Sequence, residues 1–263
     1  MENLKMLNMQ VNSLTALPSD IGKLSNLTVL NLKGNKIQKI PDNFGSMTSL
    51  QELHLSDNDL MELSDEIGKL TALRELYLDG NNLKTVPAAI AGLTGCLKKL
   101  HLGDNQLETL PPDIGKLATL SELLLSDNQL LSLPPELFDL PNLTVLNLND
   151  NSLSELPSTI GNLANLQQLL LNGNGLQLLP KETGQLLKLQ VLLLRSNALA
   201  TLPLSLCRLS ALREFDLDDN PLMTPLSELW AERGPGAVLT YLRSIHSMNQ
   251  KKAAAANGTE GAQ

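Results

Sequence analysis

Leucines and other aliphatic residues recur along the chain at a fixed spacing, with polar residues between them. Leu53 and Leu55 flank His54 with a period of two, which predicts a short β-strand with its leucines on one face and His54 on the other. Each such strand is followed by an asparagine, at Asn12, Asn35, Asn58, Asn81, Asn105, Asn128, Asn151, Asn174, Asn197 and Asn220. The interval is 23 residues at every step except from Asn81 to Asn105. That interval is 24 residues, because one residue is added at Gly95-Cys96. The pattern therefore predicts ten repeats of one structural unit.

One repeat cannot bury its own leucines, so we expect the units to stack with their strands paired in parallel around a continuous core. The asparagine side chains should bond backbone groups in the turn that leaves each strand, because buried backbone polar groups need partners. A proline that directly follows a leucine in most repeats, such as Pro111 after Leu110, ends the extended pairing. A segment of the type Ile114-Gly115-Lys116-Leu117 then supplies the apolar side of a short helical or 3₁₀ return.

The repeat resembles a known family. Leu143, Leu146, Leu148, Asn151 and Leu153 fit the pattern LxxLxLxxNxL of leucine-rich repeats. Leu110, Pro111, Ile114, Gly115 and Leu117 fit LPxxIGxL, which resembles the cytosolic class of 23-residue repeats. The resemblance covers residues 4 to about 222. It implies an α/β fold, a curved leucine-rich-repeat solenoid with a parallel inner sheet and a C-terminal capping helix.

The repeat pattern breaks after Asn220, and the chain there predicts a different structure. Leu226, Leu229 and Trp230 precede a helix with Val238, Leu242 and Ile245 at positions i, i+4 and i+7. We expect ten repeats over residues 1–222, a cap over 223–249 that covers the last leucines, and a disordered tail over 250–263. A helix that binds a partner is the alternative to a cap.

Part of this C-terminal region carries a narrower resemblance. Asn220-Pro221-Leu222 and residues 236–244 are similar to the C-terminal cap of two groups, the leucine-rich-repeat-containing protein 40 group and the plant intracellular Ras-group proteins.

At the N-terminal end the chain enters directly on its first repeat, which leaves the strand around Leu7 and Met9 as an open edge. We expect either that the chain is part of a longer protein or that this strand meets another chain.

Composition and charge restrict the classes of partner. Formal net charge is -8, with 20 Lys and Arg against 28 Asp and Glu, which argues against a nucleic-acid surface and favours a basic partner. Cys96 and Cys207 form no metal motif and no disulfide framework, so we expect free thiols. The first residues show no secretory signal, and no apolar run of about 18 residues predicts a membrane span. These features favour the cytoplasm.

Function should depend on the strand residues that face away from the leucines. In the first half His54, Tyr77 and His101 lie on consecutive strands beside Glu52, Glu75 and Lys99, a polar surface with an aromatic anchor. In the second half, aliphatic residues at the same positions predict an exposed patch. The alternative for both groups of residues is that they result from sequence drift among the repeats and have no role in binding. The expected partner-binding residues are Glu52, His54, Glu75, Tyr77, Lys99, His101, Glu122, Leu124, Val145, Asn147, Gln168, Leu170, Val191 and Leu193.

A second row of polar residues immediately precedes the asparagines: Val11, Gly34, Asp57, Gly80, Asp104, Asp127, Asp150, Gly173, Ser196 and Asp219. Gly, Asp and Ser suit a tight turn with left-handed backbone, so we favour turn chemistry over a row of carboxylates for a basic partner. Other acidic residues, which no turn requires, support an acidic face better: Glu52, Glu75, Asp79, Glu122 and Glu214.

No motif indicates an enzyme. Phosphate-binding loops, nucleophile elbows and the metal-binding patterns HExxH and CxxC do not occur, so we expect no catalytic residue, metal or cofactor. His54 and His101 are two strands apart, about 10 Å, too far to share a zinc ion held at about 2 Å.

The resemblance implies binding of a protein partner on the concave face. Charge, hydropathy and the lack of catalytic motifs predict no nucleic acid, no membrane span and no enzymatic activity. The leading hypothesis is an interaction scaffold in Ras-type intracellular signalling, with a small GTPase or a phosphatase complex as partner. The alternative is a recognition domain cut from a larger multidomain enzyme, such as a GTPase, kinase, cyclase or ubiquitin ligase. An extracellular receptor or adhesion domain would predict cysteine-rich caps and a signal peptide, which the sequence does not show.

Overall fold

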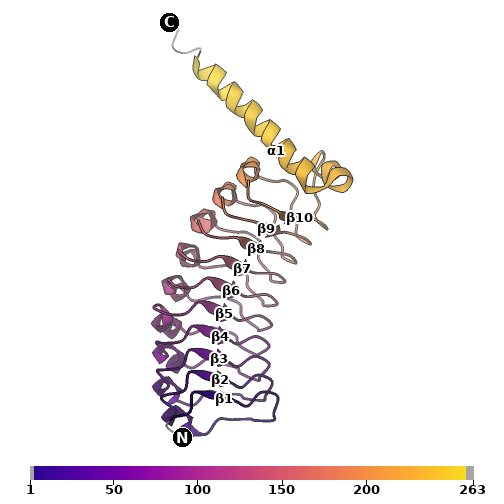
Figure 1. Ribbon diagram of the computed structural model, residues 1–263. Coiled ribbons are helices and arrows are strands. Elements are labelled where there is room, and N and C mark those ends of the chain that lie inside the picture. Colours follow the sequence, from indigo (N-terminus) through magenta and orange to yellow (C-terminus); the bar gives the residue numbers. More distant parts are fainter. Residues whose placement is uncertain (1–2, 259–263) are drawn as a thin grey trace.

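The computed structural model describes residues 3–258, and Figure 1 shows them as a curved stack of coils with one parallel sheet. Ten strands of three residues follow one another in the sheet in sequence order. They are β1 (Met6–Asn8), β2 (Val29–Asn31), β3 (Glu52–His54), β4 (Glu75–Tyr77), β5 (Lys99–His101), β6 (Glu122–Leu124), β7 (Val145–Asn147), β8 (Gln168–Leu170), β9 (Val191–Leu193) and β10 (Glu214–Asp216). The predicted parallel solenoid is confirmed.

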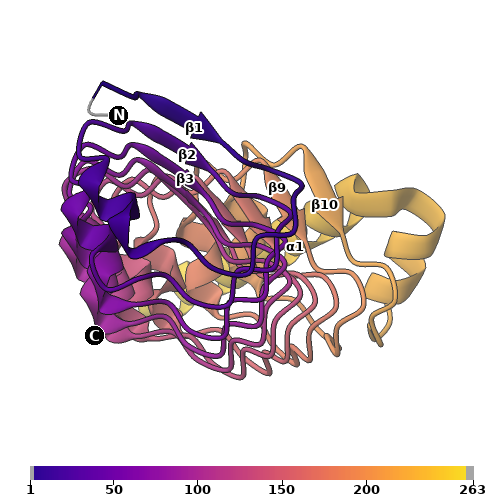
Figure 2. The same cartoon turned by 90° about the horizontal axis from the view of Figure 1, so that it is seen from below.

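Within residues 3–258, nine 3₁₀ segments form a second layer on the opposite side of the coils (Figure 2). A proline precedes most of them in an extended conformation, as at Pro18 and Pro87, and so ends the extended part of each coil. They are η1 (Ser19–Lys23), η2 (Phe44–Ser46), η3 (Asp65–Lys69), η4 (Ala88–Leu93), η5 (Pro112–Lys116), η6 (Pro135–Asp139), η7 (Ser158–Asn162), η8 (Lys181–Gln185) and η9 (Leu204–Arg208). The expected return segments are therefore 3₁₀ helices.

The strands pair in a constant register, so equivalent residues of successive repeats lie side by side. Leu53 pairs with Leu76, and Tyr77 pairs with His101. The longer repeat between β4 and β5 keeps this register, because its added residue lies between η4 and β5. A Cβ atom on Gly95 would have no neighbour within 4 Å there. The added residue thus lies at the outer side of the coil and leaves the sheet unchanged.

Between the two layers the leucines form one continuous hydrophobic core. Leu53, Leu76 and Leu146 are fully buried, as are the equivalent residues of almost every coil. Thr183 departs from this pattern, because it occupies the buried position that holds Ile, Leu or Phe in the other 3₁₀ segments. Its hydroxyl is buried and has no hydrogen-bond partner in the described part of the chain. Thr183 is therefore a polar defect in an aliphatic core.

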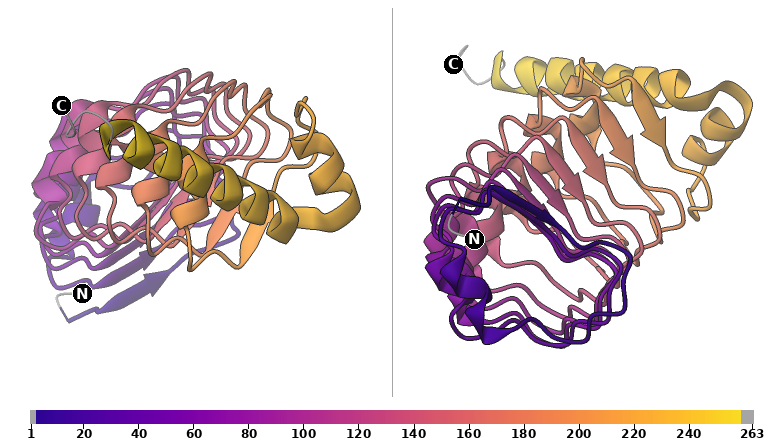
Figure 3. Two further views of the ribbon diagram at one scale, coloured as in Figure 1. Left: turned by 90° about the horizontal axis from the view of Figure 1, so that it is seen from above. Right: turned by 60° about the horizontal axis from the view of Figure 1, so that its bottom comes forward.

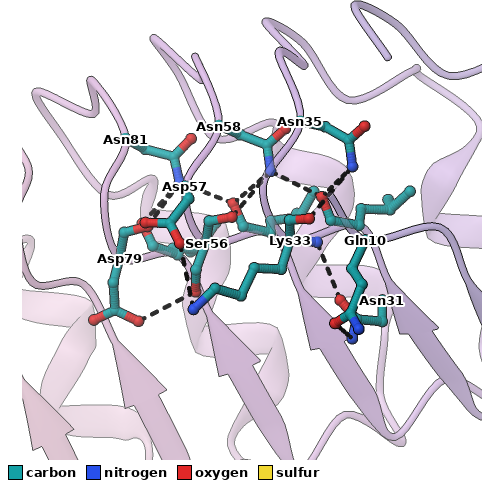
Figure 4. Close-up of polar contacts among 12 residues, drawn as sticks. Gln10, Asn31, Lys33, Asn35, Ser56, Asp57, Asn58, Asp79 and Asn81 are labelled. Carbon is teal, nitrogen blue, oxygen red and sulfur yellow. Dashed lines mark hydrogen bonds and ion pairs between the residues drawn. The ribbon is translucent and has the colours of Figure 1, made fainter. Parts of the chain in front are cut away.

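The asparagines close the turns with hydrogen bonds to two coils at once. The Nδ2 atom of Asn58 donates to the carbonyl oxygens of Leu55 and Leu32, both at 3.1 Å. Its Oδ1 atom accepts from the backbone N–H of Ile37 at 3.0 Å. Figure 4 shows Asn35, Asn58 and Asn81 repeating this arrangement along the stack. The predicted role of the asparagines is confirmed, and from Asn35 onward each one also links its coil to the preceding coil.

The residue before each asparagine has a left-handed backbone. The φ angle is 55° at Asp57, 65° at Gly80 and 54° at Ser196, and all ten equivalent positions are positive. Gly, Asp and Ser tolerate this region, which confirms that turn geometry selects the residues there. Val11, with φ of 53°, is the exception, since a β-branched residue is strained in this conformation.

The C-terminal helix α1 (Leu226–Gly258) caps the last coil. It bends at Gly234, where φ is 68°, and its longer second part crosses the end of the solenoid beside η9 (Figure 3). Val238 and Leu242 are buried against the core, as expected of a cap. The helix continues past residue 249, where we expected the cap to end, and so extends into the expected tail. Residues 259–263 of that tail lie outside the described residues.

Candidate concave binding surface

Two rows of outward side chains run along the concave sheet. The first row holds the first residue of every strand and the second row holds the third residue, because the middle residue points into the core. The constant register places each side chain next to its equivalent on the neighbouring strand. All fourteen expected binding residues belong to these rows: Glu52, Glu75, Lys99, Glu122, Val145, Gln168 and Val191 to the first, and His54, Tyr77, His101, Leu124, Asn147, Leu170 and Leu193 to the second.

Three rings of the second row are in contact across β3, β4 and β5. The rings of His54 and Tyr77 stack with centroids 4.5 Å apart and planes 10° from parallel. His101 meets Tyr77 edge to face, with a centroid distance of 4.8 Å and an angle of 89°. Such geometries stabilise a ring pair by roughly 0.5–1.5 kcal/mol beyond the burial of area. We call His54, Tyr77 and His101 the aromatic strip.

Carboxylates of the first row hold the aromatic strip in place. The Tyr77 hydroxyl donates a hydrogen bond to Glu75, whose other oxygen lies 3.3 Å from Lys99 Nζ. The Tyr77 hydrogen bond, with help from Lys99, lowers the pKa of Glu75. Burial, reinforced by the same hydrogen bond, raises the pKa of Tyr77, so this phenol stays protonated and donating.

The two histidines of the strip also face carboxylates. His101 Nε2 lies 2.7 Å from Glu122 Oε1, and His54 Nε2 lies 3.8 Å from a carboxylate oxygen of Glu52. Side chains of four consecutive strands are thereby connected into one fixed polar surface. Fixed rings with few rotatable bonds lose little entropy on binding, which favours this surface as a contact for a partner.

The aliphatic side chains of the second half do not form one unbroken patch. Leu170 and Leu193 are neighbours on β8 and β9. Asn147 lies between Leu124 and Leu170 in the second row. Similarly, Gln168 separates Val145 from Val191 in the first row. The continuous apolar part is therefore the group Leu170, Val191 and Leu193, which we call the aliphatic patch.

A further row of polar residues, two positions before the asparagines, was only partly foreseen. Asp79 accepts from the Ser56 hydroxyl at 3.3 Å and from Gly103 N–H at 3.1 Å (Figure 4 shows the Ser56 bond). Asn172 accepts from Arg195 N–H at 2.8 Å. Arg195 pairs with Asp219 at 2.9 Å, which raises the pKa of Arg195. The recurrence of polar residues at this repeat position was the signal that could have identified the row.

Among residues 3–258, no cluster of three or more His, Cys, Asp or Glu side chains has a geometry that could hold a metal ion. Cys96 and Cys207 are both free thiols, and Cys207 is buried. None of the helices in this described part of the chain combines the length and hydropathy needed to cross a membrane.

The geometry agrees with comparisons to known proteins. Models of leucine-rich repeats match residues 72–93, 96–117 and 118–176, and a model of a leucine-rich-repeat region matches residues 1–79. The solved structure of a leucine-rich-repeat protein from Leptospira interrogans is 35% identical, with a TM-score of 0.60 over 86% of this chain and 69% of that one. The chain belongs to the leucine-rich-repeat family.

Other solved leucine-rich-repeat structures share the fold at lower identity. The functional domain of InlJ from Listeria monocytogenes, which includes a cysteine ladder, has a TM-score of 0.71 at 24% identity over 83% of this chain. A plant peptide hormone receptor has a TM-score of 0.62 at 28% identity over 84% of this chain. This leucine-rich-repeat chain spans 44% of each of those two structures. No curated protein matches it.

Proposed function

We propose that this leucine-rich-repeat protein binds a protein partner on its concave face, without catalysing a reaction itself. The single observation that supports this most is the aromatic strip. The rings of His54, Tyr77 and His101 contact one another and neighbouring carboxylates. These three residues face outward, so packing of the core does not explain why they are aromatic. Tyrosine in such fixed, half-buried settings is frequent among the residues that dominate binding energy.

Affinity purification with the full chain tests this proposal. We expect Tyr77→Glu combined with Leu170→Glu to abolish capture of a specific protein, because each change puts a charge into the concave surface. The matched control is Leu131→Glu combined with Leu178→Glu, two leucines that are 62% and 64% exposed outside the two concave rows. Circular dichroism should show both variants folded. Equal capture by the two variants would contradict the proposal.

The finer proposal is an interaction scaffold in the cytoplasm that acts in Ras-type signalling, with a small GTPase or a phosphatase complex as partner. The two free cysteines support a reducing compartment. Similarity of the C-terminal cap to the leucine-rich-repeat-containing protein 40 and plant intracellular Ras groups supports the signalling role.

The alternative is the recognition domain of a larger enzyme, such as a GTPase, kinase, cyclase or ubiquitin ligase. The chain covers under half of several related structures, which is compatible with a repeat array that belongs to a longer protein. Mass spectrometry of the endogenous protein distinguishes the two candidates, since the alternative requires peptides from a catalytic domain in the same polypeptide.

A further inference from the structure

The two halves of the concave face differ in charge. Each repeat presents five outward positions: the residue before the strand, the first and third strand residues, and the two residues before the asparagine. Over β1 to β5 the charges balance, with carboxylates at Glu52, Asp57, Glu75, Asp79 and Asp104 and cations at Lys5, Lys33, Arg74, Lys98 and Lys99. Over β6 to β10 seven carboxylates, Glu122, Asp127, Asp150, Glu214, Asp216, Asp218 and Asp219, face two cations, Arg195 and Arg213.

Few cations neutralise the carboxylates of the second half of the concave face. Arg195 is already paired with Asp219, and Glu122 contacts His101 of the first half through one oxygen. Among the described residues, Glu214, Asp127 and Asp150 have no ion-pair partner, and all three are exposed. The surplus of negative charge therefore faces solvent and is available to a cationic group of a partner.

The aliphatic patch lies between carboxylates along the sheet. On one side Glu214 pairs in register with Val191, and Asp216 pairs with Leu193. On the other side Glu122 lies two strands before Leu170. With neighbouring strands about 4.8 Å apart, the distance from β6 to β10 is about 19 Å. A helix of about 13 residues, or a shorter extended segment, has this length.

We propose that this half of the concave face binds a segment of a protein partner that carries aliphatic side chains in its middle and Lys or Arg at both ends. The aliphatic residues contact Leu170, Val191 and Leu193, while the cations lie near Glu122 at one end and near Glu214 and Asp216 at the other. This inference rests on the proposed function and names the chemistry of the partner. The same surplus of carboxylates repels a nucleic acid, whose phosphates require cations.

A peptide-display selection on the full chain provides the test. The probe is a library of random peptides of about 16 residues, long enough to span about 19 Å as a helix. We expect the selected peptides to have aliphatic residues flanked by Lys or Arg, to weaken with rising salt, and to be lost with Leu170→Glu. Selected peptides without excess basic residues, or the absence of any peptide that depends on Leu170, would overturn the proposal.

Charge-neutral variants separate an effect of the second half of the concave face from an effect of net charge. The test variant is Glu122→Gln with Glu214→Gln and Asp216→Asn. Its matched control is Asp42→Asn with Glu62→Gln and Glu155→Gln, which removes the same charge at three exposed residues outside the concave face. These amides keep an oxygen that accepts the existing hydrogen bonds, such as the one from Asp218 N–H to Asp216. The test variant should weaken the selected peptides by about tenfold or more and the control by less than about twofold. Equal losses would refute the assignment to the second half.

The partner found by affinity purification distinguishes this inference from the proposed function. If capture is lost with Tyr77→Glu alone but unchanged in the test variant, the concave face binds a partner and the inference about its chemistry is wrong. If capture is unchanged in every concave variant, the proposed function itself is wrong.

Discussion

At the scale of single residues, the asparagines are the polar side chains on which the fold depends most. Asn128 illustrates their position: it is buried, donates to backbone carbonyls of its own and the preceding coil, and accepts from Leu107 N–H at 2.9 Å. Its removal leaves backbone groups without partners in a region that excludes water.

We therefore expect Asn128→Ala to lower the free energy of unfolding by about 2 kcal/mol, the usual cost of unpaired buried polar groups. Urea denaturation followed by circular dichroism measures this. The control is Gln129→Ala at the neighbouring exposed position, which should change stability by under about 0.5 kcal/mol. Similar losses for both variants would show that the asparagine bonds contribute little.

Thr183 predicts a change in the opposite direction. Valine has the same shape without the unpartnered hydroxyl, so Thr183→Val should raise the free energy of unfolding by about 1 kcal/mol. Thr201→Val, at an exposed site, serves as the control for the loss of a hydroxyl. A loss of stability in Thr183→Val would indicate that the hydroxyl has a partner in solution.

The pKa of Tyr77 can be followed by the ultraviolet absorbance of its phenolate. In a Tyr241→Phe background Tyr77 is the remaining tyrosine, and its pKa should lie above the ordinary 10.0 because of burial and the bond to Glu75. The raised folded-state pKa means that this stabilising contribution is complete below about pH 10 and is lost as pH rises further. Adding Glu75→Ala, which removes the acceptor, should lower the titration midpoint; no change would contradict the hydrogen bond.

The outward face of each strand and the left-handed turns could be predicted from the sequence. Strand periodicity places Glu75, Tyr77 and His101 on the outward face, and the Gly, Asp and Ser series before the asparagines indicates left-handed turns. The contacts of these side chains depend on rotamers and on spacing across strands, which periodicity does not determine. The stacking of His54 on Tyr77 and the break in the aliphatic residues at Asn147 were therefore visible only in the structure.

At the scale of elements, α1 packs differently from the repeats, because it lies across the end of the stack. Leu242 is 2% exposed and covers the end of the core beside η9. The repeat spacing predicted neither the bend at Gly234 nor the continuation past residue 249, because both depend on local backbone geometry outside the repeats.

Leu242→Ala should cost about 2–5 kcal/mol, as for other leucines removed from a core. Met248→Ala, on the exposed part of the same helix, is the matched control. Hydrogen exchange should accelerate first in the amides of β10 and η9. If exchange rose equally in all ten strands, α1 would stabilise the molecule as a whole and not the last coil.

At the scale of the whole molecule, each coil contacts mainly its two neighbours. Stability in such a stack is a sum of terms within coils and between adjacent coils. Because the repeat pattern specifies this architecture directly, the solenoid and its concave face could be predicted from the sequence. The identity of a partner could not, since it depends on the few side chains that differ between repeats.

A core truncation in the middle of the stack tests this local coupling. Leu146→Ala should lower stability by about 2–5 kcal/mol. It should raise hydrogen exchange most in β6, β7 and β8 and progressively less toward the ends. Uniform acceleration along the sheet would instead indicate a single cooperative unit.

The added residue beside Gly95 bears on how such a surface can change over time. A coil that gains length does so on its outer arc, where a new residue meets open space, while β4 and β5 keep their pairing. Insertions and substitutions are thus confined to different sides of the molecule. The outer arc can absorb changes of length, and the alignment of recognition residues from one coil to the next survives them.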